Sequence, residues 1–243
     1  SGEGYVYLQK AVEQITGKPA DDLLSELVFV PLDMRASSYV WRNEYDAQSA
    51  TGHGLIGNPV LKLKPGKANV AASLHTTALD YARFVIAAMS GLGLKQGSAD
   101  QMLSMQVKVD EECTNCLTNK PPHLSENLGW GLGWGLEKLD EGTYFWHWGD
   151  NGVFRCFAMA SRQSRSGMVM FTNSIHGLSI LDEMVKLTIG GVHPATSWVR
   201  YDQYNSPARR ILFTALKEGA DAAIRQYRAA AEKQPGTAVP VSY

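Results

Sequence analysis

Residues 145–152 (FWHWGDNG) place one histidine between two tryptophans, directly before a polar turn sequence. A β-prone aromatic run leads into His147 and a second apolar run begins at Val153, so the histidine lies at a strand end or in the following turn. An imidazole there could carry protons near neutral pH, bind a metal, or be a core side chain bonded to a backbone carbonyl. Its position alone leaves these three uses open.

The residues that could act together with this histidine favour some of these three uses over others. The other histidines stand at no metal-ligand spacing such as H-x-x-x-H, so a metal site is disfavoured and we expect no cofactor. No serine is followed by lysine three residues later, and no G-x-S-x-G occurs. The sequence therefore offers a possible proton carrier without a recognisable nucleophile beside it.

The cysteines suggest little chemistry. Cys113 and Cys116 form a single C-x-x-C in a polar loop, which favours a local disulfide or two free thiols over a zinc or redox site. Cys156 stands in an apolar run and is interpreted as a small core residue.

Length, composition and charge exclude several classes of protein. The chain has 243 residues, 44% of them hydrophobic, and a formal net charge of -1, so no general attraction to nucleic acid or anionic membrane is expected. No apolar run approaches the roughly 18 residues of a transmembrane segment, and no signal peptide is visible. The chain opens Ser-Gly-Glu-Gly without an initiator methionine, which suggests a fragment or a processed product.

Helical periodicity dominates the first half of the chain. Helices are predicted over 4–16, ending at Gly17, and over 20–29. A third begins at Thr77, whose hydroxyl is placed to cap it, with Asp80 three residues on as in a capping box. A short helix follows near 97–105, and segment 109–126 is predicted to be a loop. Segment 36–70 is predicted to be mixed and largely irregular, with a short strand at Ser38–Trp41.

From residue 128 the apolar period changes to two. Residues 128–136 alternate large apolar side chains with glycine, which predicts a strand with Trp130 and Trp134 on one packed face. The other face has no side chains, so another backbone or a ligand can approach it closely. Segments 143–147, 153–161 and 168–173 continue it as a meander of about four antiparallel strands, and helix 180–189 could cover one face. Two helices within 206–234 form a C-terminal hairpin, for which packing on the body or on a partner stays open.

These elements predict an α/β (α+β) fold with an antiparallel sheet flanked by helices. Residues 1–127 are expected to form a helical and loop region, 128–192 the sheet with its covering helix, and 195–243 a helical extension.

Several stretches together resemble one family. His147-Trp148-Gly149 is similar to its His-x-Gly or Lys-Thr-Gly motif, and the opening SGEGYVYLQKAVEQITGKP resembles the run after the tyrosine of its Tyr-x-Asn motif. PLDM (31–34), AASLHTTALDYARF (71–84) and LGWGLGWGLE (128–137) also resemble typical runs. In this order, from residue 1 to about 190, they resemble the class C β-lactamase-like branch of the serine β-lactamase and penicillin-binding protein superfamily.

The resemblance implies a β-lactamase/transpeptidase-like fold and acyl transfer through a serine. It implies that His147 takes the place of the motif lysine, that Gly149 leaves room for the acyl group, and that the Asp150 N–H helps to bind the oxyanion. Trp148, Ser1 and Gly2 would border the substrate, although Gly2 stands where the family usually has asparagine.

The same resemblance shows what the chain lacks. Neither the Ser-x-x-Lys motif nor the tyrosine of the second motif is present, so the chain is expected to be inactive without an N-terminal segment that carries them. A complementary N-terminal polypeptide of the same protein is therefore an expected partner, because its absence would expose apolar surface. The substrate would be a β-lactam, a D-Ala peptide of the peptidoglycan type or a small ester, and the location periplasmic. The alternative is a non-catalytic ligand-binding or interaction module that keeps the cleft without the nucleophile.

Overall fold

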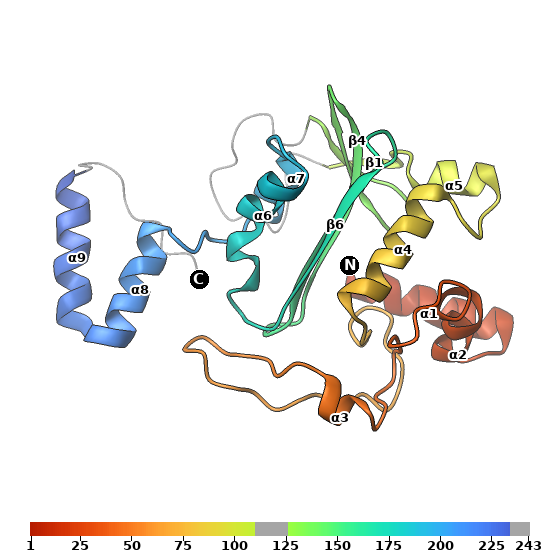
Figure 1. The fold of residues 1–243 in the computed structure, drawn as a ribbon, viewed down its shortest axis with the longest axis horizontal. Helices are drawn as coiled ribbons and strands as arrows, with labels where there is room; N and C mark the ends of the chain where they lie inside the picture. Colours follow the sequence, from red (N-terminus) through yellow and green to blue (C-terminus); the bar gives the residue numbers. More distant parts are fainter. Residues whose placement is uncertain (110–125, 234–243) are drawn as a thin grey trace.

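The computed structural model describes residues 1–109 and 126–233, which fold around a single antiparallel sheet (Figure 1). Its six strands follow one another in the order β1-β2-β3-β4-β5-β6, so each strand pairs with its neighbours in the chain. The strands are β1 (Val107–Lys108), β2 (Leu128–Trp130), β3 (Gly135–Leu139), β4 (Gly142–Asp150), β5 (Arg155–Ser161) and β6 (Ser166–Thr172). The predicted α+β class with a helix-flanked antiparallel sheet is confirmed.

The glycine-rich segment 128–136 differs from its prediction. It forms two short strands, β2 and β3, joined by a turn in which Gly133 has φ 84°. A Cβ on Gly131 would lie 2.3 Å from the Met102 carbonyl oxygen, so at this glycine another backbone approaches closely, which is one of the two uses predicted for the glycine face. Because of the turn, Trp130 and Trp134 pack into different clusters, and the prediction that they share one face was wrong.

Two helices of the first half, residues 2–16 and 78–90, have the capped ends that local signals indicate, the first of them starting two residues before its predicted bound. The Ser1 hydroxyl accepts from Gly4 N–H at 3.1 Å to cap the first helix, which ends at Gly17 with φ 67°. The Thr77 hydroxyl accepts from Asp80 N–H at 3.2 Å. The helices of this half are α1 (Gly2–Thr16), α2 (Ala20–Leu24) with the π-helical turn η1 (Ser25–Phe29), α3 (Tyr45–Gln48), α4 (Ala78–Ser90) and α5 (Gln96–Met102).

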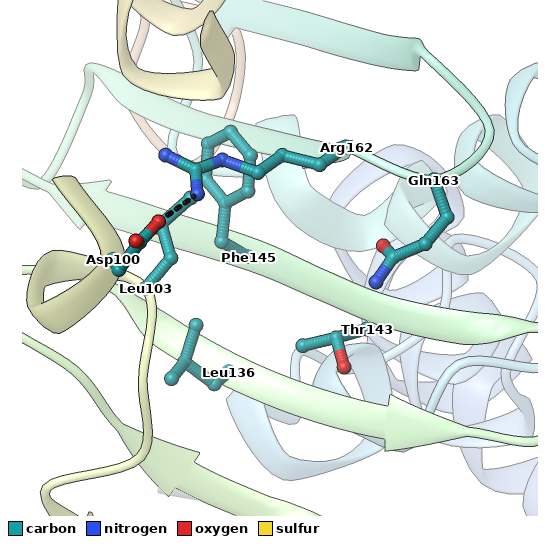
Figure 2. A pocket seen from close by; sticks show the side chains of 7 residues that line it. All are labelled: Asp100, Leu103, Leu136, Thr143, Phe145, Arg162 and Gln163. Carbon is teal, nitrogen blue, oxygen red and sulfur yellow. Dashed lines mark hydrogen bonds and ion pairs between the residues drawn. The ribbon is translucent and has the colours of Figure 1, made fainter. Parts of the chain in front are cut away.

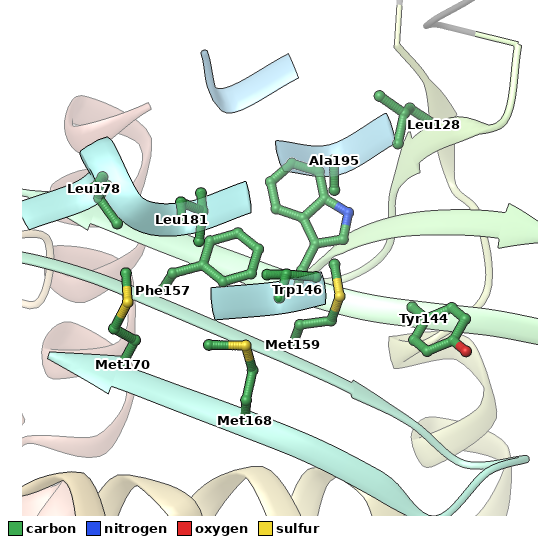
Figure 3. Packing of buried hydrophobic residues seen from close by; sticks show 11 residues of the cluster. Leu128, Tyr144, Trp146, Phe157, Met159, Met168, Met170, Leu178, Leu181 and Ala195 are labelled. Carbon is green, nitrogen blue, oxygen red and sulfur yellow. The ribbon is translucent and has the colours of Figure 1, made fainter. Parts of the chain in front are cut away.

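Helices cover both faces of the sheet (Figure 1). Helix α4 packs on one face over β5 and β6, and helices α6 (Leu181–Thr188) and α7 (Pro194–Val199) pack on the other with the 3-10 turn η2 (Gly177–Ile180). Figure 3 shows the cluster on the α6/α7 face, where Trp146 and Phe157 of the sheet meet Leu181 and Ala195 of the covering helices. Burying these large side chains fixes the strands that carry the site.

The C-terminal hairpin stands apart from the sheet (Figure 1). It consists of α8 (Pro207–Glu218), capped by Ser206, and α9 (Ala220–Lys233). Helix α8 contacts the rest of the chain through His176, which precedes η2. Arg209 donates to His176 Nδ1 at 2.5 Å, and Phe213 packs on the same imidazole.

The three expected regions can be compared with these contacts. Strand β1 lies within the expected helical and loop region 1–127 but pairs with β2, and α7 lies at the start of the expected extension 195–243 but packs on the sheet. Cys113 and Cys116 lie outside the described residues. In the described part of the chain, no helix is both long enough and apolar enough to cross a bilayer.

Candidate active site

The last residues of β4 project beyond the end of its neighbour β3. Strand β3 pairs with β4 only as far as Trp146. On the other side, Asn151 N–H donates to the Phe154 carbonyl at 2.9 Å where the β4–β5 hairpin closes. Since ladder bonds alternate along an antiparallel pair, the backbone groups of Trp148 and Asp150 point away from β5. No strand of the described chain pairs with them there, so this end of β4 is an open sheet edge.

His147 lies at this edge, and one of its two ring nitrogens is already hydrogen-bonded. Its Nδ1 lies 2.8 Å from the Trp148 carbonyl oxygen, which can only accept, so Nδ1 carries the proton and donates. The lone pair is then on Nε2. The imidazole ring lies 6.0 Å from the Trp130 ring and 6.5 Å from the Trp134 ring, centre to centre. This packing holds the ring in one orientation.

The surroundings of His147 favour the neutral imidazole. Burial lowers the pKa of His147 below its ordinary value of 6.5. The bond to the Trp148 carbonyl opposes this shift, and the positive amino group of Ser1 adds to it. At pH 7 the ring is therefore mostly uncharged, with a lone pair on Nε2 that can accept a proton or a hydrogen bond.

The next residue on the same face is Gly149, since side chains alternate along β4. A Cβ on Gly149 would lie 2.8 Å from Cys156 Sγ, its partner on β5. Burial raises the pKa of the Cys156 thiol, which keeps it uncharged at neutral pH. The absence of a side chain at Gly149 thus serves close packing against Cys156 and also leaves the strand edge uncovered.

Asp150 follows with its side chain on the opposite, α6/α7 face. Its Oδ2 accepts from Tyr201 OH at 2.5 Å and forms an ion pair with Arg155 Nε at 3.1 Å. Its Oδ1 accepts from Gly152 N–H at 2.8 Å. The carboxylate is thereby engaged on both oxygens, while the backbone N–H of Asp150 points to the open edge.

Trp148 also places its side chain on the α6/α7 face. Its ring lies 5.9 Å from Trp146 and 5.3 Å from Trp198, centre to centre, within a group of four indoles completed by Trp130. The ring is partly buried, and its proposed contact with substrate stays a prediction.

Ser1 and Gly2 lie on the His147 side of the sheet. The Ser1 amino group is close enough to act electrostatically on His147. Gly2 lies against Ala71, since a Cβ on it would be 3.8 Å from the Ala71 Cβ. The first residue of the chain thus lies within electrostatic range of the histidine motif, 146 positions away (147 − 1), and the contact of Ser1 and Gly2 with substrate stays a prediction.

One cavity lies elsewhere, around the start of β4 (Figure 2). It encloses about 190 Å³ between Thr143, Gln163 and the guanidinium of Arg162. Arg162 pairs with Asp100 at 3.2 Å and donates to the Met89 carbonyl at 2.8 Å, at the end of α4. The guanidinium of Arg162 is already bonded to the ends of two helices, so we do not propose this cavity as a catalytic or binding site. In residues 1–109 and 126–233, no cluster of His, Cys, Asp and Glu side chains could hold a metal.

Sequence reasoning missed Tyr201 and Arg155 as neighbours of the motif. Tyr201 lies in the connection between α7 and α8, which carries no recognisable pattern, and meets Asp150 across 51 positions. Arg155 directly follows the β4–β5 hairpin turn, and its pairing opposite Asp150 was the one available signal.

With this geometry described, comparisons with known proteins can be stated. The family model described as Beta-lactamase matches residues 1–185. No curated protein matches the chain significantly.

Solved structures share the fold. An octameric penicillin-binding protein homologue from Pyrococcus abyssi aligns with a TM-score of 0.60 and 20% identity, over 88% of this chain and 46% of its own. A D-stereospecific amidohydrolase from Streptomyces sp. aligns with a TM-score of 0.55 and 20% identity, over 71% and 49%. A D-alanine carboxypeptidase from Burkholderia cenocepacia gives 0.58 and 16%, over 72% and 55%. The chain therefore spans about half the length of these structures, and at such identities the likeness establishes the fold alone.

Proposed function

Because the chain belongs to the β-lactamase family, we propose that it is the C-terminal part of a serine hydrolase that forms an acyl-enzyme. The serine would attack the carbonyl carbon of a β-lactam, a D-Ala peptide or a small ester, and the amide or ester bond at that carbon would be cleaved.

The open end of β4 is the observation that carries this proposal. It combines an unpaired backbone donor at Asp150 with a neutral imidazole whose Nε2 lone pair is free. An N–H at a strand edge can bind the negative oxygen that develops when a hydroxyl adds to a carbonyl. His147 Nε2 can accept a hydrogen bond or a proton from the attacking group or its neighbour. Gly149 leaves the strand edge free for the acyl group.

The serine, lysine and tyrosine are proposed to come from an N-terminal segment of the same protein. Two features of the described chain support such a partner. The outer edge of β6 pairs with no strand in the described ranges, and such an edge readily accepts one. On α4, Leu79 is 64% exposed and Ile86 is 57% exposed, which is unusual for large apolar side chains on one helix. Activity is accordingly expected only when both parts are present.

Covalent labelling of the complete protein tests this function. A fluorophosphonate that reacts with active-site serines is added to the protein with its upstream segment and, separately, to the 243-residue chain. We expect one adduct on a serine of the upstream segment, its loss in a His147→Ala variant, and no adduct on the isolated chain. Absence of labelling, combined with thermal stabilisation by a ligand that is not turned over, would support the non-catalytic binding module instead.

Export to the periplasm is proposed on the family resemblance alone. Cell fractionation of the source organism tests it, since recovery of the complete protein in the cytoplasmic fraction would contradict the proposal.

A further inference from the structure

The carboxylate of Asp150 is held more firmly than an exposed strand end requires. It accepts hydrogen bonds from the Tyr201 hydroxyl at 2.5 Å and from the Gly152 N–H at 2.8 Å, and it forms an ion pair with Arg155, whose Nε lies 3.1 Å away. Two hydrogen bonds and one ion pair on a single side chain restrict the peptide units on either side of it.

Tyr201 is the central group of this network. Its ring lies beneath the Arg155 guanidinium, 4.7 Å from the guanidinium carbon to the ring centre. Burial, and then the bond and charge of Asp150, raise the pKa of Tyr201, so the phenol stays protonated and donates. The Trp148 side chain is close enough to the hydroxyl to oppose these influences on the pKa of Tyr201. Tyr201 thus contacts both residues that flank Gly149.

Tyr201 lies far along the chain from the strand that it contacts. It follows α7 and lies beyond residues 1–185, the part matched by the family model. The C-terminal segment therefore reaches the rear of the same strand whose front carries His147. Because side chains alternate, the side chains of Trp148 and Asp150 are fixed on the rear face while their N–H groups remain at the edge.

We propose that Tyr201, acting with Arg155, is a positioning residue that holds the Asp150 N–H in the orientation that binds the oxyanion. The inference rests on the proposed hydrolase function and extends it to the segment after α7. Oxyanion donors contribute only when they are aimed at the transition-state oxygen, so a small rotation of this peptide would lower turnover without removing the donor. A purely structural anchor would instead affect stability and leave turnover by the folded protein unchanged.

The test compares Tyr201→Phe with Tyr204→Phe in the complete protein. The first removes the hydroxyl and keeps the ring under Arg155, and the second is a matched control on the same connection, 47% exposed. For Tyr201→Phe we expect kcat to fall roughly 10- to 100-fold, less than the ~10²–10³-fold cost of losing an oxyanion donor. KM should stay within about twofold, since ground-state contacts are kept. A boronic acid that mimics the tetrahedral state should lose affinity by the same factor as kcat/KM.

Wild-type kcat and boronate affinity in Tyr201→Phe would overturn the proposal. If that variant does not fold, Asp150→Asn replaces it, because it keeps an acceptor for Tyr201 and weakens the pairing with Arg155. It should reduce kcat and boronate affinity in the same direction, and unchanged values would again overturn the proposal.

A second measurement separates this inference from the proposed function. Hydrogen exchange of residues 148–152 should be faster in Tyr201→Phe than in Tyr204→Phe, whatever the activity. Equal exchange would refute the positioning role. Failure of the wild-type protein to react with the fluorophosphonate would refute the hydrolase while leaving the exchange result to decide the positioning of the strand.

Discussion

Replacing His193 with alanine should destabilise the protein far more than the loss of an ordinary ion pair. His193 is 4% exposed and Glu137 is 0% exposed, and His193 Nδ1 bonds directly to Glu137 Oε1. The other oxygen, Glu137 Oε2, accepts from Ala195 N–H at 2.9 Å at the start of α7. Without the imidazole, a buried carboxylate keeps a single donor.

The expected cost follows from this burial. Breaking a buried pair by removing one partner costs about 3–5 kcal/mol, which at about 2–4 °C per kcal/mol lowers the melting midpoint by roughly 6–20 °C. The control is Lys18→Ala, which breaks an ion pair with Glu26 whose side chains are 48% and 57% exposed. That change should cost about 0–1 kcal/mol. Thermal and urea unfolding of the complete protein, followed by circular dichroism, measure both.

The same pair gives a pH dependence with a defined sign. Burial by itself would lower the pKa of His193, but the hydrogen bond and charge of Glu137 outweigh it and raise the pKa above 6.5. The stabilisation is therefore fully present below pH 6.5 and is lost as the pH rises through the folded-state pKa. The His193→Ala variant should lack this decline. A cost no larger than that of Lys18→Ala, or an unchanged pH slope, would refute the reasoning.

Three further changes test other parts of the account. Gly135→Ala places a Cβ 2.5 Å from the buried Trp146 ring and should cost about 1–3 kcal/mol in urea unfolding, whereas Gly97→Ala, in open space on a helix, should be neutral or stabilising. The lowered pKa of His147 predicts that kcat/KM of the complete protein falls on the acid side with an apparent pKa below 6.5, and that His147→Gln lacks this limb; an identical limb in the variant would contradict the role. Arg162→Lys keeps the charge but not the geometry of the bonds to the helix-end carbonyls, so a melting midpoint lowered by about 2–8 °C is expected, and no change would contradict it.

Local signals in the sequence account for the ends of three helices. A serine or threonine that bonds to an N–H three residues on marks the starts of α1, α4 and α8, and Gly17 and Gly91 adopt left-handed conformations at two ends. These bonds form within one helical turn, so the sequence order alone reveals them. The antiparallel strands from β4 onward were predicted for the same reason, because short hairpins join them.

The site could be predicted only in part. The motif singled out His147, Gly149 and Asp150 as candidates, but the open edge depends on β3 beginning only at Gly135, after a glycine turn that packs on distant backbone. The contact of Asp150 with Tyr201 joins residues 51 positions apart. Such contacts arise from tertiary packing, which leaves no periodic pattern in the sequence.

The central claim is that the free end of β4 forms one wall of an acyl-transfer site, and a structure of the complete protein with a covalently bound boronic acid tests it most directly. We predict that the boron is attached to a serine of the upstream segment, that a boronate oxygen lies about 2.7–3.1 Å from the Asp150 nitrogen, and that His147 Nε2 faces the same site. A boronate bound away from β4, or a His147 ring closed off from it by other side chains, would contradict the account.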